Sequence, residues 1–188
     1  MRSTLLLFAT VSLSGCVVVQ QVPKTWESRT LSSGCPSVAG QYENKGEDAS
    51  GSKPSLASLL EEAIGADRGL DQQSRSKLSL ALRNANTVAL SLAGDEDVEI
   101  IVSSDAVIAR WVLSKDKFSC ANGVMSIQKS ASFGGDNVGM VRNVVLDIQR
   151  SERYLMLNSH GGGAGFILFV PVVGYESIWS RFPAVKAP

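Results

Sequence analysis

Alternation of apolar and polar residues is the feature that most constrains the fold of this chain. Successive side chains of a strand point to opposite faces, so a period of two predicts half-buried β-strands. The alternating segments lie near 76–84, 88–92, 98–102, 107–113, 144–149 and 153–158. For residues 74–84 a helix is the alternative to the favoured strand, because Leu and Ala also suit helices.

Asn122-Gly123 is the strongest turn signal and predicts a two-residue β-hairpin. In that register Ala121 faces Val124, Cys120 faces Met125 and Phe118 faces Ile127. The last two pairs share the apolar face, since alternate cross-strand pairs lie on one side. Cys120 is therefore expected to point inward.

One segment has helical rather than strand periodicity. Apolar residues follow the i, i+3, i+4 spacing of an amphipathic helix over about 55–64. Ser58 and Glu61 have the spacing of a capping box, and Gly65 is placed to end the helix.

Together these patterns predict a mainly β fold. We expect a first strand around Gly40–Tyr42, then the helix, then an antiparallel meander that closes into a barrel or a sandwich. Residues 134–137 and the glycine-rich stretch 160–165 are expected to be loops. The apolar run 166–173 is expected to be a strand buried on both faces, with Pro171 at an edge or bulge.

The N-terminus has the layout of a secretory signal. Arg2 precedes a short apolar stretch, and Ser14-Gly15 provides small residues before Cys16. The stretch is shorter than the ~20 residues that a membrane-spanning helix needs. The segment Leu13-Ser14-Gly15-Cys16 resembles the lipobox of bacterial lipoproteins.

This resemblance implies that residues 1–15 are removed and that Cys16 is acylated, anchoring the protein to the membrane. Val17 is not the Asp that, in those lipoproteins, favours inner-membrane retention, so an outer-membrane location facing the periplasm is expected. Residues 16–34 are expected to be a lipidated tether with a reach of about 20 to 25 Å. Trp26 would dock on the domain or sit at the membrane interface. Residues 35–188 would form one β-rich domain.

Cys35 and Cys120 are the remaining two of three cysteines. An exported protein folds in an oxidising compartment, so a structural disulfide between them is expected. Two separately buried thiols are the alternative. Closing so long a loop stabilises a fold by roughly 4 to 5 kcal/mol in the chain-entropy treatment.

Charge and composition disfavour several functions. Lys plus Arg and Asp plus Glu number 18 each, with no basic cluster, which disfavours nucleic-acid binding. A single histidine and no close Cys pair leave no expected metal site, and no cofactor or catalytic residue is assigned. His160-Gly161-Gly162-Gly163 copies an oxyanion segment of some lipases, but no G-x-S-x-G accompanies it.

We therefore expect a non-catalytic domain that binds an apolar ligand or another envelope protein. An envelope hydrolase with a carboxylate-based site is the alternative. The stretch His160, Gly161, Gly162 and Gly163 is the candidate binding loop, because mobile loops on rigid scaffolds often carry function.

Two weaker resemblances cover only short motifs. Gly40-x-Tyr42 and Arg181 are similar to the lipocalin pattern of Gly-x-Trp with a late basic side chain over the ring, although tyrosine replaces tryptophan. The segment 35–46, containing Cys35-Pro36 and Gly40-x-Tyr42-x-Asn44-x-Gly46, and Trp179-x-Arg181-Phe182 resemble uncharacterised proteobacterial lipoproteins, which imply no activity.

Overall fold

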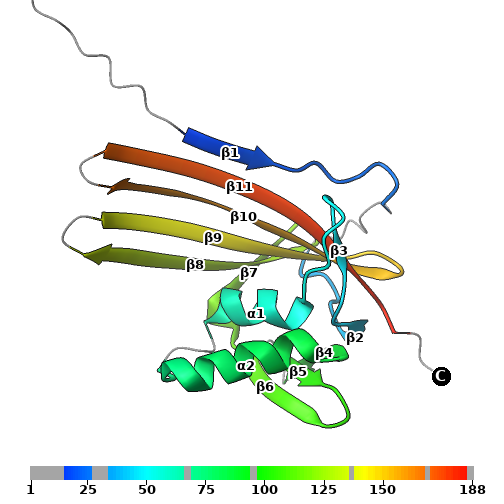
Figure 1. The fold of residues 1–188 in the computed structure, drawn as a ribbon. Coiled ribbons are helices and arrows are strands. Elements are labelled where there is room, and N and C mark those ends of the chain that lie inside the picture. The colour runs from blue at the N-terminus through cyan, green and yellow to red at the C-terminus, as the bar shows by residue number, and fades with distance from the viewer. Residues whose placement is uncertain are drawn as a thin grey trace, which may run out of the picture.

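The structure is a computed structural model and describes residues 15–26, 34–65, 69–93, 97–135, 138–167 and 170–185. These residues form a mainly β fold of two sheets and two α-helices (Figure 1). Neither sheet closes into a barrel among the described strands.

The large sheet has the strand order β1-β11-β10-β9-β8-β7. Its four long strands form an antiparallel meander. Their bounds are β8 Val124–Gly135, β9 Val138–Arg150, β10 Tyr154–Ile167 and β11 Val170–Pro183. The short strands at its edges are β1 Gly15–Val19, parallel to β11, β7 Phe118–Ala121, and β3 Glu47–Asp48, which pairs with β11 at Ser180 and Arg181.

The small sheet has the order β2-β4-β5-β6, and all of its neighbours are antiparallel. Its strands confirm the alternating segments 88–92, 98–102 and 107–113 and the expected first strand. They are β2 Gly40–Glu43, β4 Thr87–Ala93, β5 Asp97–Ser103 and β6 Val107–Leu113. A single 3-10 turn, η1 Lys115–Lys117, then leads into β7.

The helix expected at 55–64 is confirmed as α1, Leu56–Ile64, and it ends at Gly65 in the left-handed conformation (φ 66°). Its N-cap is Ser55 rather than a box at Ser58: the Ser55 hydroxyl accepts a hydrogen bond from the Ser58 amide.

The strand favoured near 76–84 is wrong, because Gln72–Asn84 form a second helix, α2. Asp71 caps it by accepting a hydrogen bond from the Ser74 amide at 2.9 Å. Leu78 and Leu82, four residues apart, pack toward the core, whereas Leu80 is 62% exposed. The observed burial therefore has the helical spacing.

The larger of two hydrophobic clusters contains residues of both sheets and both helices. It contains Leu56 and Leu60 of α1, Leu82 of α2, and inward residues of β4, β5, β8, β9 and β10. At one end of this core Asn44 is fully buried: its amide nitrogen donates to the Leu82 and Ala85 carbonyls, and its side-chain oxygen accepts from the Ala57 amide.

The Asn122-Gly123 hairpin is confirmed, with Ala121 opposite Val124, Cys120 opposite Met125 and Phe118 opposite Ile127. Asn122 and Gly123 both have positive φ, as a type I′ turn requires. The expected disulfide is present between Cys35 and Cys120. It ties the segment before β2 to the large sheet.

Three expected loop or core segments differ. The stretch 160–165 is not a loop but the middle of β10, and Gly134 and Gly135 end β8. The run 166–173 is not one strand buried on both faces: β10 ends at Ile167 and β11 begins at Val170, and Phe166, Pro171 and Val173 are exposed. Backbone pairing on both sides holds the glycine-rich part of β10 extended despite its weak strand propensity.

The described part of the expected tether also lies along the domain. Residues 15–19 pair with Val173–Ser177, and the Gln20 amide donates to the Ser177 carbonyl. Trp26 is buried against Met156 and Trp179, so it docks on the domain. Residues 27–33 lie outside the described residues, as do residues 1–14 of the expected signal.

The long strands of the large sheet reach well beyond α1 and α2 (Figure 1). In the described part of the chain, no helix combines the length and apolar character needed to cross a membrane.

Candidate functional site: a trough with a glycine floor

A glycine-lined depression lies on the extended half of the large sheet. In the strand register Gly163 of β10 lies beside Gly174 of β11, and Gly161 lies two residues along β10 on the same face. Three adjoining positions of this face thus carry no side chain. The neighbouring residues on either side do carry side chains, so the three glycines form the floor of a hollow between them.

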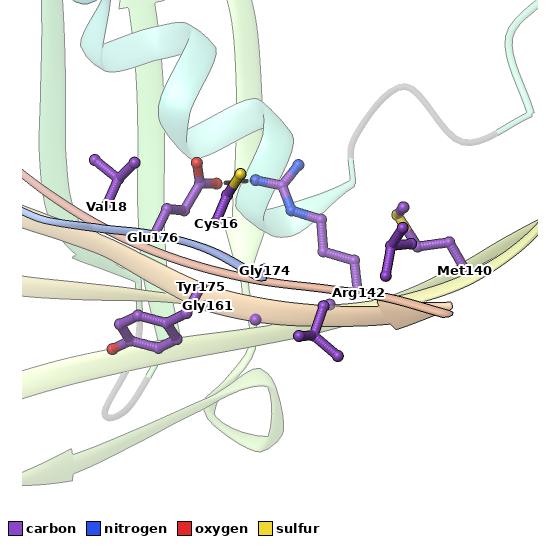
Figure 2. Close-up of a pocket in the computed structure, with 12 residues that line it drawn as sticks. Cys16, Val18, Met140, Arg142, Gly161, Gly174, Tyr175 and Glu176 are labelled. Atoms are coloured by element: carbon purple, nitrogen blue, oxygen red, sulfur yellow. Dashed lines mark hydrogen bonds and ion pairs between the residues drawn. The ribbon is translucent and has the colours of Figure 1, made fainter. Parts of the chain in front are cut away.

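The walls of this trough come from the flanking strands. Cys16 and Val18 of β1 border one side, and Met140 and Arg142 of β9 border the other, with Val172 and Glu176 from β11. The trough has a volume of about 440 Å³ and is open to solvent. Figure 2 shows Cys16, Glu176 and Arg142 on one face of the sheet, while the Tyr175 ring points to the other.

One ion pair crosses the trough. The Arg142 guanidinium contacts the Glu176 carboxylate, and both side chains are 41% exposed. The pair bridges over β10, because Arg142 lies beside Gly163 and Glu176 lies beside Gly161. The trough therefore offers apolar walls and one internally balanced charged group.

The floor glycines are not equivalent. A Cβ at Gly161 would collide with the carbonyl oxygen of Asn143, so any larger residue there would displace β9. A Cβ at Gly174 would instead meet only the Cys16 carbonyl oxygen at 3.6 Å, which is an ordinary contact. Gly174 is therefore the floor position where a side chain fills the trough without moving the backbone.

The structure brings some predicted site residues together and separates others. Cys16 and Gly161, Gly162 and Gly163 all line the trough, although the glycines belong to a strand rather than a loop. His160 lies on the opposite face, where its Nε2 is 3.1 Å from Asp147 Oδ2.

Asp147 also accepts a hydrogen bond of 2.6 Å from the Ser126 hydroxyl. The carboxylate thus lies between the serine and the histidine. A nucleophilic serine needs the histidine itself as its hydrogen-bond partner, which this order does not provide.

Arg181 has ring partners other than Tyr42. Its guanidinium lies 4.8 Å from the Trp26 ring centroid and 4.7 Å from that of Tyr154. Its Nε also donates to Glu47 at 2.6 Å. These contacts hold the N-terminal segment and β3 against the end of β11.

Two other hollows contain fewer of the predicted residues. One of about 390 Å³ lies beside the disulfide and includes Cys35 and Phe118, and one of about 870 Å³ lies between β6 and β8. Across the three hollows, the only lining carboxylates are Glu176 in the trough and Asp116 in the largest. None of the three therefore presents two carboxylates to one another.

Sequence reasoning missed Arg142 and Glu176. They are far apart in the chain, and only the register of β9, β10 and β11 puts them on one face. The sequence shows an Arg and a Glu with opposite charges at alternating strand positions. Without the strand register, it does not show that the two residues form a pair.

Within the described residues, no group of three or more His, Cys, Asp or Glu side chains is arranged to hold a metal ion. Comparison of the chain with protein-family models, with curated proteins and with solved structures found no match in any of the three.

Proposed function

We propose that this protein is an outer-membrane lipoprotein, acylated at Cys16 and facing the periplasm, whose β domain binds an apolar or amphiphilic ligand in the trough. The trough itself is the observation that carries the binding proposal. Ligand sites are usually concave, mostly apolar and about 300 Å³ or larger, with a few polar groups that orient the ligand. The trough is open and mostly apolar, has a volume of about 440 Å³, and includes the charged side chains of Arg142 and Glu176.

The chemistry of the walls indicates the ligand class. Met140, Val18 and Val172 suit an acyl chain or a similar flexible apolar group. The Arg142 and Glu176 side chains are each 41% exposed. A polar headgroup at the solvent side of the trough therefore contacts both charged groups while they remain in contact with water. A hydrolase would need a different arrangement, in which a second carboxylate faces Glu176.

The position of the trough supports the same proposal. Cys16 is an exposed free cysteine in the trough wall. Lipid attached there joins the domain at its binding surface, and β1 pairing holds the attachment point against the sheet. The ligand would then be taken up at the membrane surface.

Filling the floor tests this proposal. The full mature chain carries Cys16→Ser, which prevents acylation, and is exported behind an ordinary cleavable signal. Its binding of palmitate is measured by titration calorimetry. Gly174→Leu is expected to weaken binding at least tenfold, because the side chain occupies the trough. Gly174→Ala, which adds only a methyl group in ordinary contact, is the matched control and should bind nearly as the parent does.

Unfolding midpoints of the two variants check that both retain the fold. Equal palmitate affinity for the Gly174→Leu variant and its parent would exclude the trough as the site. Absence of binding by the parent would exclude an acyl-chain ligand.

A further inference from the structure

Charged side chains stop abruptly along the large sheet. The strand register places Cys16, Gly174, Gly163 and Arg142 side by side in one row. Beyond this row, toward the strand connections, lie residues 132–135, 138–141, 164–167 and 170–173, which we call the apolar end. None of these strand residues is Asp, Glu, Lys, Arg or His, and the one charged residue within 132–141 and 164–173 is Asp136, in the β8–β9 connection.

Three large apolar side chains of the apolar end are exposed rather than packed on the core. Val141, Phe166 and Val173 are 53%, 44% and 44% exposed, respectively. In the register Val141, Ala164 and Val173 form one row, so these residues make a continuous patch rather than scattered positions. Contiguous exposed apolar surface of this kind marks a protein or membrane contact.

Interfacial residues lie at the boundary of the apolar end. Arg142 is in the Cys16 row itself, and Glu176 and Lys129 follow two residues further from the tip. Tyr175, 42% exposed, is adjacent to the Cys16 row on the face opposite the trough. Tyrosine is enriched where membrane hydrocarbon meets the headgroups.

Cys16 connects this pattern to the bilayer. We propose that the apolar end rests in the membrane interface beside the lipid on Cys16, with Tyr175 and the Arg142–Glu176 pair at headgroup level. This inference rests on the proposed acylation of Cys16. Lipid chains attached to Cys16 hold the Cys16 row at the membrane surface. The uncharged residues beyond this row then lie against the bilayer.

The backbone limits the depth of insertion. β7 covers only Val124–Ile127 of β8, so among the described strands nothing pairs with the outer edge of β8 from Gln128 onward. Open sheet edges do not occur in the hydrocarbon region, because their amide and carbonyl groups would lack partners. The apolar end therefore enters only about 5–10 Å, where water and headgroups still reach the edge.

A second copy of the chain is the competing occupant, since an open strand edge also invites pairing with another molecule. We favour the bilayer because the uncharged residues begin next to the row that contains Cys16, the proposed site of lipid attachment. Pairing between two copies of the chain would not require the uncharged residues to begin there. The test separates these two occupants.

The test uses tryptophan fluorescence in the acylated full chain. Phe166→Trp places a reporter on the apolar end, and Leu80→Trp places a matched reporter at an exposed leucine of α2, away from the large sheet. Both proteins and wild type are reconstituted in phosphatidylethanolamine–phosphatidylglycerol vesicles. The acyl chains are brominated near the headgroup, brominated near their ends, or unbrominated.

We expect bromine near the headgroup to quench at least about half of the emission that Phe166→Trp adds. Bromine at the chain ends should quench this emission less. Neither brominated lipid should quench the emission that Leu80→Trp adds. Equal quenching of both reporters, or stronger quenching by chain-end bromine, overturns the shallow insertion. Blue-shifted Phe166→Trp emission without quenching also overturns it and indicates a second copy.

The unacylated Cys16→Ser chain separates this proposal from the lipid anchor. Added to preformed vesicles at high lipid concentration, its Phe166→Trp form should show the same preference for headgroup-proximal bromine. If acylation fails in cells while this quenching persists, the anchor is wrong and the membrane contact of the apolar end still holds. Absence of quenching in this chain, with Cys16 acylated in cells, overturns the contact alone.

Discussion

Cys16 lies directly opposite Gly174 in the parallel pairing of β1 with β11. Because Gly174 has no side chain, the exposed Cys16 borders an open trough rather than a packed neighbour. The same row marks the point beyond which the four long strands carry no ionisable residue. The proposed lipid attachment, the proposed ligand trough and the apolar end therefore meet at one position of the sheet.

The disulfide is expected to carry a large share of the domain's stability. Replacing both Cys35 and Cys120 with serine should lower the free energy of unfolding by roughly 2–5 kcal/mol, because the unfolded chain gains freedom. Urea unfolding in the absence of reductant measures this. Cys16→Ser is the control and should leave the midpoint unchanged, since Cys16 is exposed and unpaired.

Gly46 is expected to tolerate no side chain. A Cβ there would collide with the Arg181 carbonyl oxygen and come within 2.6 Å of Phe182 Cδ1, in the core. Gly46→Ala should cost about 1–3 kcal/mol through overpacking, measured as a lower urea midpoint. Gly34→Ala is the matched control, because no atom lies within 4 Å of the added methyl group. Equal midpoints for the two variants would contradict this packing.

Tyr42 should make stability fall at alkaline pH. Burial raises the pKa of Tyr42 above its ordinary value, an effect that the nearby Arg150 charge partly offsets. Above about pH 10 the unfolded chain therefore loses a proton that the folded protein retains, and the free energy of unfolding decreases.

Tyr42→Phe removes this effect. At neutral pH the variant should be less stable by about 1 kcal/mol, since the Val38 carbonyl loses the 2.9 Å hydrogen bond from the Tyr42 hydroxyl. The difference from wild type should shrink as the pH approaches about 11, as followed by urea unfolding at each pH. A difference that stays constant from neutral to alkaline pH would show that Tyr42 does not titrate this way.

Local signals were sufficient where one short motif determines the geometry. Asn122-Gly123 predicted the register of β7 and β8 residue by residue, because positive φ at both positions allows only one kind of hairpin. The helical spacing of apolar residues in α1 and the glycine that ends the helix were also correctly predicted.

The second helix was missed for a specific reason. Leu78, Leu80 and Leu82 satisfy a period of two, and Leu78 with Leu82 also satisfies the i, i+4 spacing of a helix. The leucines alone do not distinguish the two patterns, whereas tertiary packing does: Leu82 is buried and Leu80 is not. The Asp71 cap preceding Gln72 is the local signal that favours the helix.

The trough could be anticipated only in part. The glycines at 161–163 were identified as a candidate site, but as a loop, because glycine weakens isolated strands. Their place on a central strand depends on the long pairings of β10 with β9 and β11. Arg142, Glu176 and Gly174 join them through that register, which no local pattern contains.

The mass of the N-terminal peptide tests the central claim most directly. The protein is expressed in a Gram-negative host, recovered from the membrane fraction and digested. Acylation predicts a peptide that begins at Cys16 and carries the added mass of a diacylglyceryl group and an N-linked acyl chain, and Cys16→Ser should abolish that peptide. A peptide with unmodified Cys16 and a free N-terminus, from protein found wholly in the soluble periplasmic fraction, would contradict the account.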